Sequence, residues 1–279
     1  MLLGLASCSP VKILNATASG DWHVTKNIAY APGPRRGLDV YAPDGAKDAP
    51  VMVFFYGGSW QEGDKAMYRF VGAALAAHGV VTIIPDYRVY PQVRFPVFLQ
   101  DCAQAVAWAK ANAHNFGGDP NRLVLMGHSA GAYNVAMLAL NPVYLNAVGM
   151  SPHDISGFIG LAGPYDFLPL QDPVIKTIFG DPAELARTQP INFVTPGAPP
   201  AYLAAGLRDK TVDPGNSMRL AAKLRAAGDE VQERYYPKLN HVLIIGATSQ
   251  LLEFLAPVLP DCLAFIHAVT ATKKLRSAA

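Results

Sequence analysis

The sequence predicts an α/β fold in which helices cover both faces of a mostly parallel central sheet. Short apolar runs alternate along the chain with segments of helical spacing, a pattern typical of parallel sheets crossed by helices. The runs carry no polar stripe, so we expect strands that are buried on both faces. Hydrophobic residues make up 51% of the 279 residues and charged residues only 16%. This composition supports a large core and excludes intrinsic disorder.

Each element follows from its own residues. The segment up to about Tyr41 supplies antiparallel edge strands, and a β-branched and aromatic run then predicts a strand at 51–56. Further strands are expected at 80–84, 123–126, 158–161, 202–205 and 231–236. Helical spacing indicates helices at 70–77, 98–114, 132–140, 217–227 and about 249–259. Catalytic groups in such a fold belong on the loops that follow the carboxyl ends of the strands.

We divide the chain into an N-terminal segment (1–20), a single domain (21–260) and a C-terminal tail (261–279). Within the domain, residues 166–200 are too few for a large lid and are expected to form a small apolar cap. Leu5-Ala6-Ser7-Cys8 resembles a bacterial lipoprotein processing box, but only six residues precede the serine, fewer than a full signal needs. One interpretation is an exported protein, lipid-anchored at Cys8 if the native precursor has a full signal. The alternative is an apolar stub on a cytoplasmic protein.

Charge and cysteine content exclude several functional classes. The net charge is only +2, and no Lys/Arg run is longer than Lys273-Lys274, which argues against a nucleic-acid partner. No apolar stretch reaches the ~18 residues that a membrane span needs. The three cysteines, Cys8, Cys102 and Cys262, are too few for a disulfide framework or a four-thiolate zinc site. The sequence leaves the oligomeric state open.

The strongest functional signal is the sequence GHSAG at residues 127–131. It follows the strand at 123–126 and precedes the helix at 132–140, which is the context of a G-x-S-x-G nucleophile elbow. The glycines at both ends let neighbouring backbone approach closely, and the start of a helix favours negative charge near Ser129. A glycine-serine loop that merely caps a helix is the alternative. The placement between strand and helix favours Ser129 as a nucleophile.

A serine nucleophile needs a base, and in this fold the chain order is serine, acid, histidine. Three histidines follow Ser129. His153 precedes any later acid-bearing strand and is interpreted as a loop residue, and His267 falls in the predicted tail. His241 follows the strand at 231–236 by a short loop, so we predict that it is the base.

The acid is expected after the strand at 202–205. Asp209 comes three residues after Gly206 and is favoured by the loop geometry that such triads require. Asp213 precedes a proline and is typical of a helix N-cap. Asp166, after the preceding strand, is a third candidate.

A glycine-rich loop at the end of the strand at 51–56 predicts an oxyanion hole. Backbone N–H groups in such a loop can point at an oxygen that becomes negative, and small residues let the backbone approach it. We expect the N–H groups of Gly58, Ser59 and Ala130 to be the donors. A purely structural Gly-Gly turn is the alternative.

These residues together resemble the α/β-hydrolase superfamily, and within it the small bacterial carboxylesterases of the hormone-sensitive-lipase and feruloyl-esterase-like group. The similarity covers about residues 37–255. Its specific matches lie at 55–60, 86–88, 95–101, 117–120, 127–131, 209–212 and 240–241. Two residues depart from the pattern: Tyr56 stands where the family usually has histidine, and Ser59 replaces its third glycine.

The resemblance implies a serine carboxylesterase that hydrolyses short-chain or aryl esters through an acyl-enzyme intermediate. No metal or organic cofactor is required, and the only partner implied is a small-molecule ester. The expected pocket residues are Trp60, His128, Tyr133 and Phe167. An aryl formamidase with the same triad is the main alternative, a peptidase is less favoured, and a catalytically inactive binding protein is a third possibility.

The resemblance also suggests structural roles for other residues. Asp86 and Arg88 are expected to pair and pin a loop above Asp101. If the protein is exported, Cys102 and Cys262 could form a disulfide.

Overall fold

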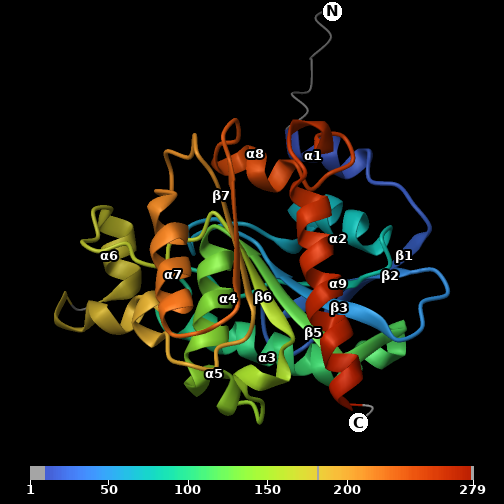
Figure 1. Ribbon diagram of the computed structural model, residues 1–279, viewed down its shortest axis with the longest axis horizontal. Coiled ribbons are helices and arrows are strands. Elements are labelled where there is room, and N and C mark those ends of the chain that lie inside the picture. Colours follow the sequence, from blue (N-terminus) through green and yellow to red (C-terminus); the bar gives the residue numbers. More distant parts are fainter. Residues whose placement is uncertain (1–9, 181, 278–279) are drawn as a thin grey trace, which may run out of the picture.

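A computed structural model describes residues 10–180 and 182–277 (Figure 1). Within these ranges eight strands form one sheet in the order β1-β2-β4-β3-β5-β6-β7-β8. β2 pairs antiparallel with both β1 and β4, and all the other neighbours are parallel. The strands are β1 (Trp22–Ala29), β2 (Gly37–Pro43), β3 (Ala49–Phe55), β4 (Val81–Pro85), β5 (Gly118–His128), β6 (Gly157–Leu161), β7 (Ala201–Gly206) and β8 (Val231–Tyr236). The predicted parallel sheet with antiparallel edge strands is confirmed.

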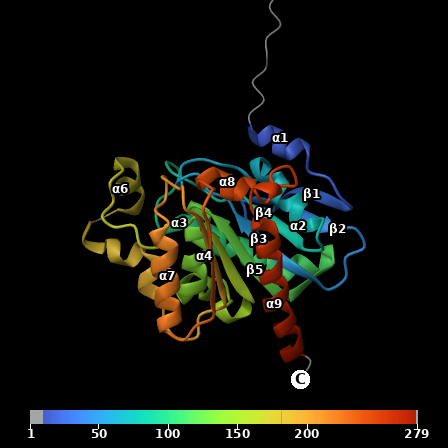
Figure 2. The ribbon, with the colours of Figure 1, turned by 45° about the horizontal axis from the view of Figure 1, so that its top comes forward.

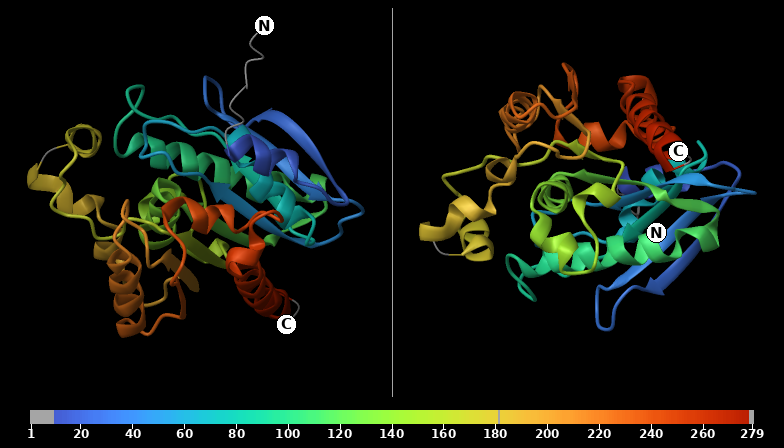
Figure 3. Two further views of the ribbon diagram at one scale, coloured as in Figure 1. Left: turned by 90° about the horizontal axis from the view of Figure 1, so that it is seen from above. Right: turned by 60° about the horizontal axis from the view of Figure 1, so that its bottom comes forward.

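The helices lie on both faces of the sheet, as the strand order requires. Parallel strands are joined by right-handed crossovers, so helices on connections that run in opposite directions along the sheet cover opposite faces. α2 (Arg69–Ala76) leads from β3 back to β4, whereas α3 (Val97–Asn112), α4 (Ala130–Leu140) and α7 (Gly215–Ala226) lead forward. α3 contacts α4, and α2 contacts the last helix, α9 (Val258–Ser277). Figure 3 shows α9 on the other side of the sheet from α3.

The core follows from the composition of the central strands. Every residue of β3, β4, β6 and β7 is buried, because neither face of these strands meets water. β8 lies at the sheet edge and alternates between exposed and partly buried positions before its buried last residue. These differences match the apolar and alternating patterns of the corresponding segments.

The C-terminal prediction is wrong in two places. The structure has α8 (His241–Gly246) and then α9, instead of one helix at 249–259 and a tail at 261–279. Cys262, Phe265, Ile266 and Val269 are buried along one side of α9. Their spacing is that of an amphipathic helix, so the local signal for a packed helix is present in the sequence.

Residues 166–200 form short helices that are tied to the domain. They include α6 (Pro173–Phe179) and 3-10 helices at Pro182–Thr188 and Pro190–Phe193. The backbone N–H of Phe95 donates to the Ile178 carbonyl, and the Tyr133 hydroxyl donates to the Thr188 carbonyl. Figure 2 shows α6 at one side of the molecule, near the end of the sheet that α8 crosses.

The N-terminal helix α1 (Pro10–Ala16) packs beside the start of α2. The Asn15 side chain donates to the Ala66 carbonyl and accepts from the Phe70 N–H. The proposed processing box and Cys8 lie outside the described residues, so the lipidation and export hypotheses stay untested. Among the helices described, none is long and apolar enough to cross a membrane.

Candidate active site

Ser129 lies in a sharp turn between β5 and α4. Its backbone has φ 56° and ψ −123°, a conformation that is costly for a residue with a side chain. The turn is possible because Gly127 and Gly131 pass close to other backbone. A Cβ on Gly127 would collide with the Gly131 carbonyl, and one on Gly131 would collide with the Phe55 carbonyl. The elbow expected from the GHSAG sequence is therefore present.

Ser129, His241 and Asp209 form one hydrogen-bonded row. His241 Nε2 lies 2.9 Å from Ser129 Oγ, and His241 Nδ1 lies 2.7 Å from Asp209 Oδ2. A carboxylate only accepts, so Nδ1 carries the proton in the neutral ring and Nε2 is left as the acceptor for the serine hydroxyl. This is the tautomer that a general base requires.

The carboxylate of Asp209 is fixed from two sides. Oδ2 faces His241, and Oδ1 accepts the backbone N–H groups of Thr211 at 2.8 Å and Val212 at 2.9 Å. Burial raises the pKa of Asp209, but the hydrogen bonds from His241, Val212 and Thr211 outweigh it and hold the pKa below its ordinary value. The other two acidic candidates, Asp166 and Asp213, lie away from this row and pair with Arg219.

His241 is the first residue of α8, just after the turn that follows β8. Asn240 caps this short helix, because its side chain accepts the N–H groups of Val242 and Leu243. Of the other two histidines considered, His153 lies in a 3-10 turn and His267 is exposed on α9, and neither is hydrogen-bonded to Ser129.

The loop after β3 has positive φ values at three successive residues. Gly58, Ser59 and Trp60 have φ values of 120°, 52° and 58°. A Cβ on Gly58 would collide with the Glu62 carbonyl, so glycine is required there. Among the described residues, the N–H groups of Gly58 and Ser59 have no hydrogen-bond partner. The Ala130 N–H is in the first turn of α4 and has no acceptor within the helix. All three predicted oxyanion donors are therefore free.

Tyr56 anchors this loop from below. Its hydroxyl donates to Asp86 Oδ1 at 2.8 Å and accepts from the Arg35 guanidinium at 3.0 Å. The Tyr87 hydroxyl donates to the Tyr56 carbonyl. Arg35 also donates to the Gly63 carbonyl at the far end of the loop. Sequence reasoning missed Arg35, which lies 21 residues before Tyr56 and in no motif.

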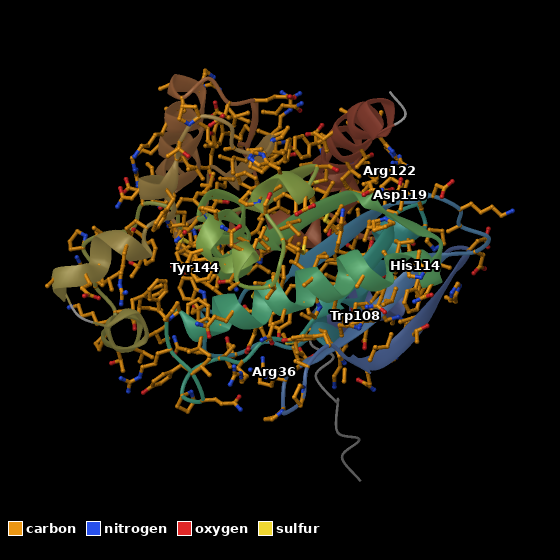
Figure 4. The ribbon with its side chains drawn as sticks, turned by 90° about the horizontal axis from the view of Figure 1, so that it is seen from below. Arg36, Trp108, His114, Asp119, Arg122 and Tyr144 are labelled. Atoms are coloured by element: carbon orange, nitrogen blue, oxygen red, sulfur yellow. The ribbon has the colours of Figure 1, made fainter. Side chains whose placement is uncertain are left out.

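The expected Asp86–Arg88 pair is wrong. Arg88 instead makes two hydrogen bonds of 2.7 Å to the carboxylate of Asp101, whose side chain is fully buried. Arg36, labelled beneath α3 in Figure 4, pairs with the same carboxylate at 3.0 Å. Two arginines compensate the one buried charge, which leaves Asp86 to hold Tyr56.

Three of the four predicted pocket residues gather in one aromatic cluster. The Trp60 ring lies 5.1 Å from the Tyr133 ring and 6.3 Å from the Phe167 ring. Phe179 of α6 packs edge-on against Trp60, with 4.8 Å between the ring centroids. The Trp60 indole N–H donates to Asn134 Oδ1, which fixes the ring. This cluster begins at the residue that follows the predicted oxyanion donors.

His128 does not belong to that cluster. It is buried below the serine, and its Nε2 lies 2.9 Å from the backbone carbonyl oxygen of His241. His128 is thus the one predicted pocket residue that the structure does not bring to the aromatic cluster, and its place in the substrate pocket stays a prediction. The side chain points toward the loop of the proposed base.

The hypothesis of a Cys102–Cys262 disulfide is also wrong. Both cysteines are buried and free. Burial raises the pKa of both thiols, which makes them unreactive core residues.

The BD-FAE family model matches residues 38–224. Esterase LipC of Mycobacterium tuberculosis is 32% identical over an alignment of 221 residues that covers 72% of this chain and 55% of LipC. Isoprenylcysteine alpha-carbonyl methylesterase ICME of Arabidopsis thaliana is 37% identical over an alignment of 156 residues that covers 53% of this chain and 36% of that protein. The chain thus spans about half or less of these two relatives.

A solved structure also resembles the whole domain. Phosphonate-inhibited esterase B of Lactobacillus rhamnosis superposes with a TM-score of 0.82 at 19% identity, covering 96% of this chain and 93% of that one. This likeness confirms the predicted α/β-hydrolase fold.

Proposed function

The chain belongs to the BD-FAE family, and from this premise we propose that it is a serine carboxylesterase acting on short-chain or aryl esters. The hydrogen-bonded row of Ser129, His241 and Asp209 carries the proposal. Each member has the partner that acyl transfer needs: a nucleophile beside a base, and a base oriented by an acid. Besides a nucleophile, a base and an acid, acyl transfer needs groups that stabilise an oxyanion, and the free N–H groups near the serine supply them.

The reaction proceeds in two halves. As Ser129 Oγ bonds to the ester carbonyl carbon, its proton passes to His241 Nε2 and the carbonyl oxygen becomes negative. Asp209 stabilises the imidazolium that forms, and the N–H groups of Gly58, Ser59 and Ala130 bind the oxyanion. His241 then protonates the departing alcohol as the ester C–O bond breaks. In the second half, water repeats the sequence on the acyl-enzyme and releases the acid and the free serine.

The aromatic cluster supports a preference for small acyl groups. Trp60 is only 4% exposed, and Tyr133 and Phe179 hold it edge-on from two sides. The cap is hydrogen-bonded to α4, because the hydroxyl of Tyr133 on that helix donates to the Thr188 carbonyl. A long acyl chain would have to displace these packed rings, whereas an acetyl or butyryl group would not.

A panel of nitrophenyl esters tests the proposal. We expect kcat/KM to be highest for acetate or butyrate and at least ~10-fold lower for octanoate, since each misplaced methylene is worth about 1–3 kcal/mol. Ser129→Ala is the control and should abolish turnover of every ester. Fastest turnover of octanoate would contradict the acyl preference. Faster turnover of an N-formylated arylamine than of nitrophenyl acetate would favour the formamidase alternative.

A further inference from the structure

His128 lies between the serine elbow, the loop of His241 and the oxyanion loop. It is the last residue of β5, directly before Ser129, and it is only 5% exposed. Its ring centroid is 4.9 Å from that of His241. On its other side is the oxyanion loop, where a Cβ on Gly57 would come within 3.3 Å of His128 Nδ1. The catalytic steps described above give this buried imidazole no task.

The hydrogen bond from His128 fixes the protonation of its ring. A carbonyl oxygen only accepts, so His128 Nε2 carries a proton and donates it to the His241 carbonyl at 2.9 Å. His128 Nδ1 is buried and has no partner among the described residues, so it cannot be protonated without leaving an unsatisfied donor. Burial, together with repulsion from a charged His241, lowers the pKa of His128 to about 3. The ring is therefore a neutral donor with one fixed tautomer.

This hydrogen bond is a second connection between the segment that carries Ser129 and the segment that carries His241. Ser129 and His241 lie 112 residues apart in the chain and reach each other through one side-chain hydrogen bond. The bond from His128 joins the backbone of the base to the residue next to the nucleophile. The distance between Ser129 Oγ and His241 Nε2 is then constrained twice: by the hydrogen bond between the two side chains, and by the bond that holds the His241 backbone. The same loop is held two residues earlier by the hydrogen bond from the Arg208 N–H to the Leu239 carbonyl, and the bond from His128 acts at His241 itself.

We propose that His128 is a positioning residue, whose Nε2–H holds the backbone carbonyl of His241 so that the base stays aligned with Ser129. The inference rests on the proposed function, because alignment matters only if Ser129 and His241 react. It gives His128, the first variable residue of the G-x-S-x-G sequence, a role in catalysis. That role acts through His241 and not on the substrate or the transferred proton.

Three substitutions distinguish the effect of the Nε2–H donor on catalysis from the effect of the volume of the ring. His128→Gln places an amide N–H at nearly the position of Nε2 and keeps a neutral side chain. His128→Asn places its N–H one bond shorter, at the level of Nδ1, and His128→Leu has no donor. His267→Gln, on the exposed face of α9, is the matched control for loss of a histidine.

The measurements are kcat and KM for nitrophenyl acetate, together with the melting temperature of each variant. We expect His128→Asn and His128→Leu to lower kcat by ~10- to 100-fold, the cost of a displaced catalytic group, with KM within about twofold. His128→Gln should recover kcat to within about fivefold of the native protein. Equal kcat in all variants would overturn the inference. So would a loss in His128→Gln as large as in His128→Leu, because the donor would then not be what matters.

A measurement on the unaltered protein covers the case in which the variants fail to fold. With ¹⁵N-labelled histidine, we expect the His128 ring to show a protonated Nε2 and a bare Nδ1 throughout pH 5 to 9. A protonated Nδ1, or titration within that range, would contradict the inference. The proposed function fails separately: the native protein would then hydrolyse no ester, while the His128 resonances would stay as expected.

Discussion

Replacing His128 by glutamine removes a cost to folding that grows as the pH falls. The imidazole is buried beside His241, and its pKa in the folded protein is about 3. In the unfolded chain a histidine has its ordinary pKa of about 6.5. Because the folded pKa is the lower one, the unfolded chain binds the proton more readily between these two values. The native protein therefore loses stability as the pH falls from 6.5 toward 3.

The two pKa values set the size of this loss. Proton linkage predicts that His128 costs the folded protein about 2 kcal/mol at pH 5, and ~3 kcal/mol at pH 4, relative to pH 7.5. Glutamine does not titrate, so the variant escapes this part of the loss. All the other titratable groups are common to both proteins, so the comparison of the two proteins isolates the part that belongs to His128.

The assay is urea unfolding of native protein and His128→Gln at pH 7.5, 6, 5 and 4. The quantity of interest is the difference in unfolding free energy between the two proteins at each pH. We expect the native protein to lose about 2 kcal/mol more than the variant between pH 7.5 and pH 5. A difference in unfolding free energy that stays constant to within about 0.5 kcal/mol from pH 7.5 to pH 5 would refute a buried neutral His128. That limit is about a quarter of the loss expected from proton linkage.

Three further substitutions test other parts of the site. Asp209→Asn should lower kcat by about 10⁴-fold through loss of the correct His241 tautomer, whereas Asp213→Asn, on an exposed carboxylate, should leave kcat within about twofold; comparable losses would contradict the choice of acid. Gly131→Ala should prevent folding, judged by circular dichroism, since its Cβ would meet the Phe55 carbonyl, while Gly37→Ala has room; a folded, active Gly131→Ala would show that the elbow is looser than described. Tyr56→Phe should cost about 1–3 kcal/mol in urea unfolding, because the partly buried partners of its hydroxyl lose a hydrogen bond. Unchanged stability would rule out Tyr56 as an anchor.

Sequence alone predicted the central strands because each is a continuous apolar run. It also located Ser129, His241 and Asp209 in the loops where the structure has them, since the order of strands fixes which loops lie at the carboxyl edge of the sheet. The elbow was the most predictable feature, because a strand, a GHSAG sequence and an Ala/Leu-rich helix follow one another without a gap.

The rest depends on contacts that no local pattern encodes. The bond from His128 to the His241 carbonyl joins residues 113 apart. The choice of Asp101 over Asp86 as the partner of Arg88 depends on how α3 docks beneath the loop. α9 differs, because the spacing of its buried residues is visible in the sequence, and interpretation as a tail overlooked it.

The most direct test of the account is the mass of the intact protein after reaction with a fluorophosphonate, followed by peptide mapping. We expect a single adduct on Ser129 in the native protein, because His241 and the free N–H groups activate that hydroxyl alone. Ser129→Ala should remain unmodified. An adduct on another residue, or equal modification of Ser129→Ala, would contradict the central claim that Ser129, His241 and Asp209 form a working nucleophile, base and acid.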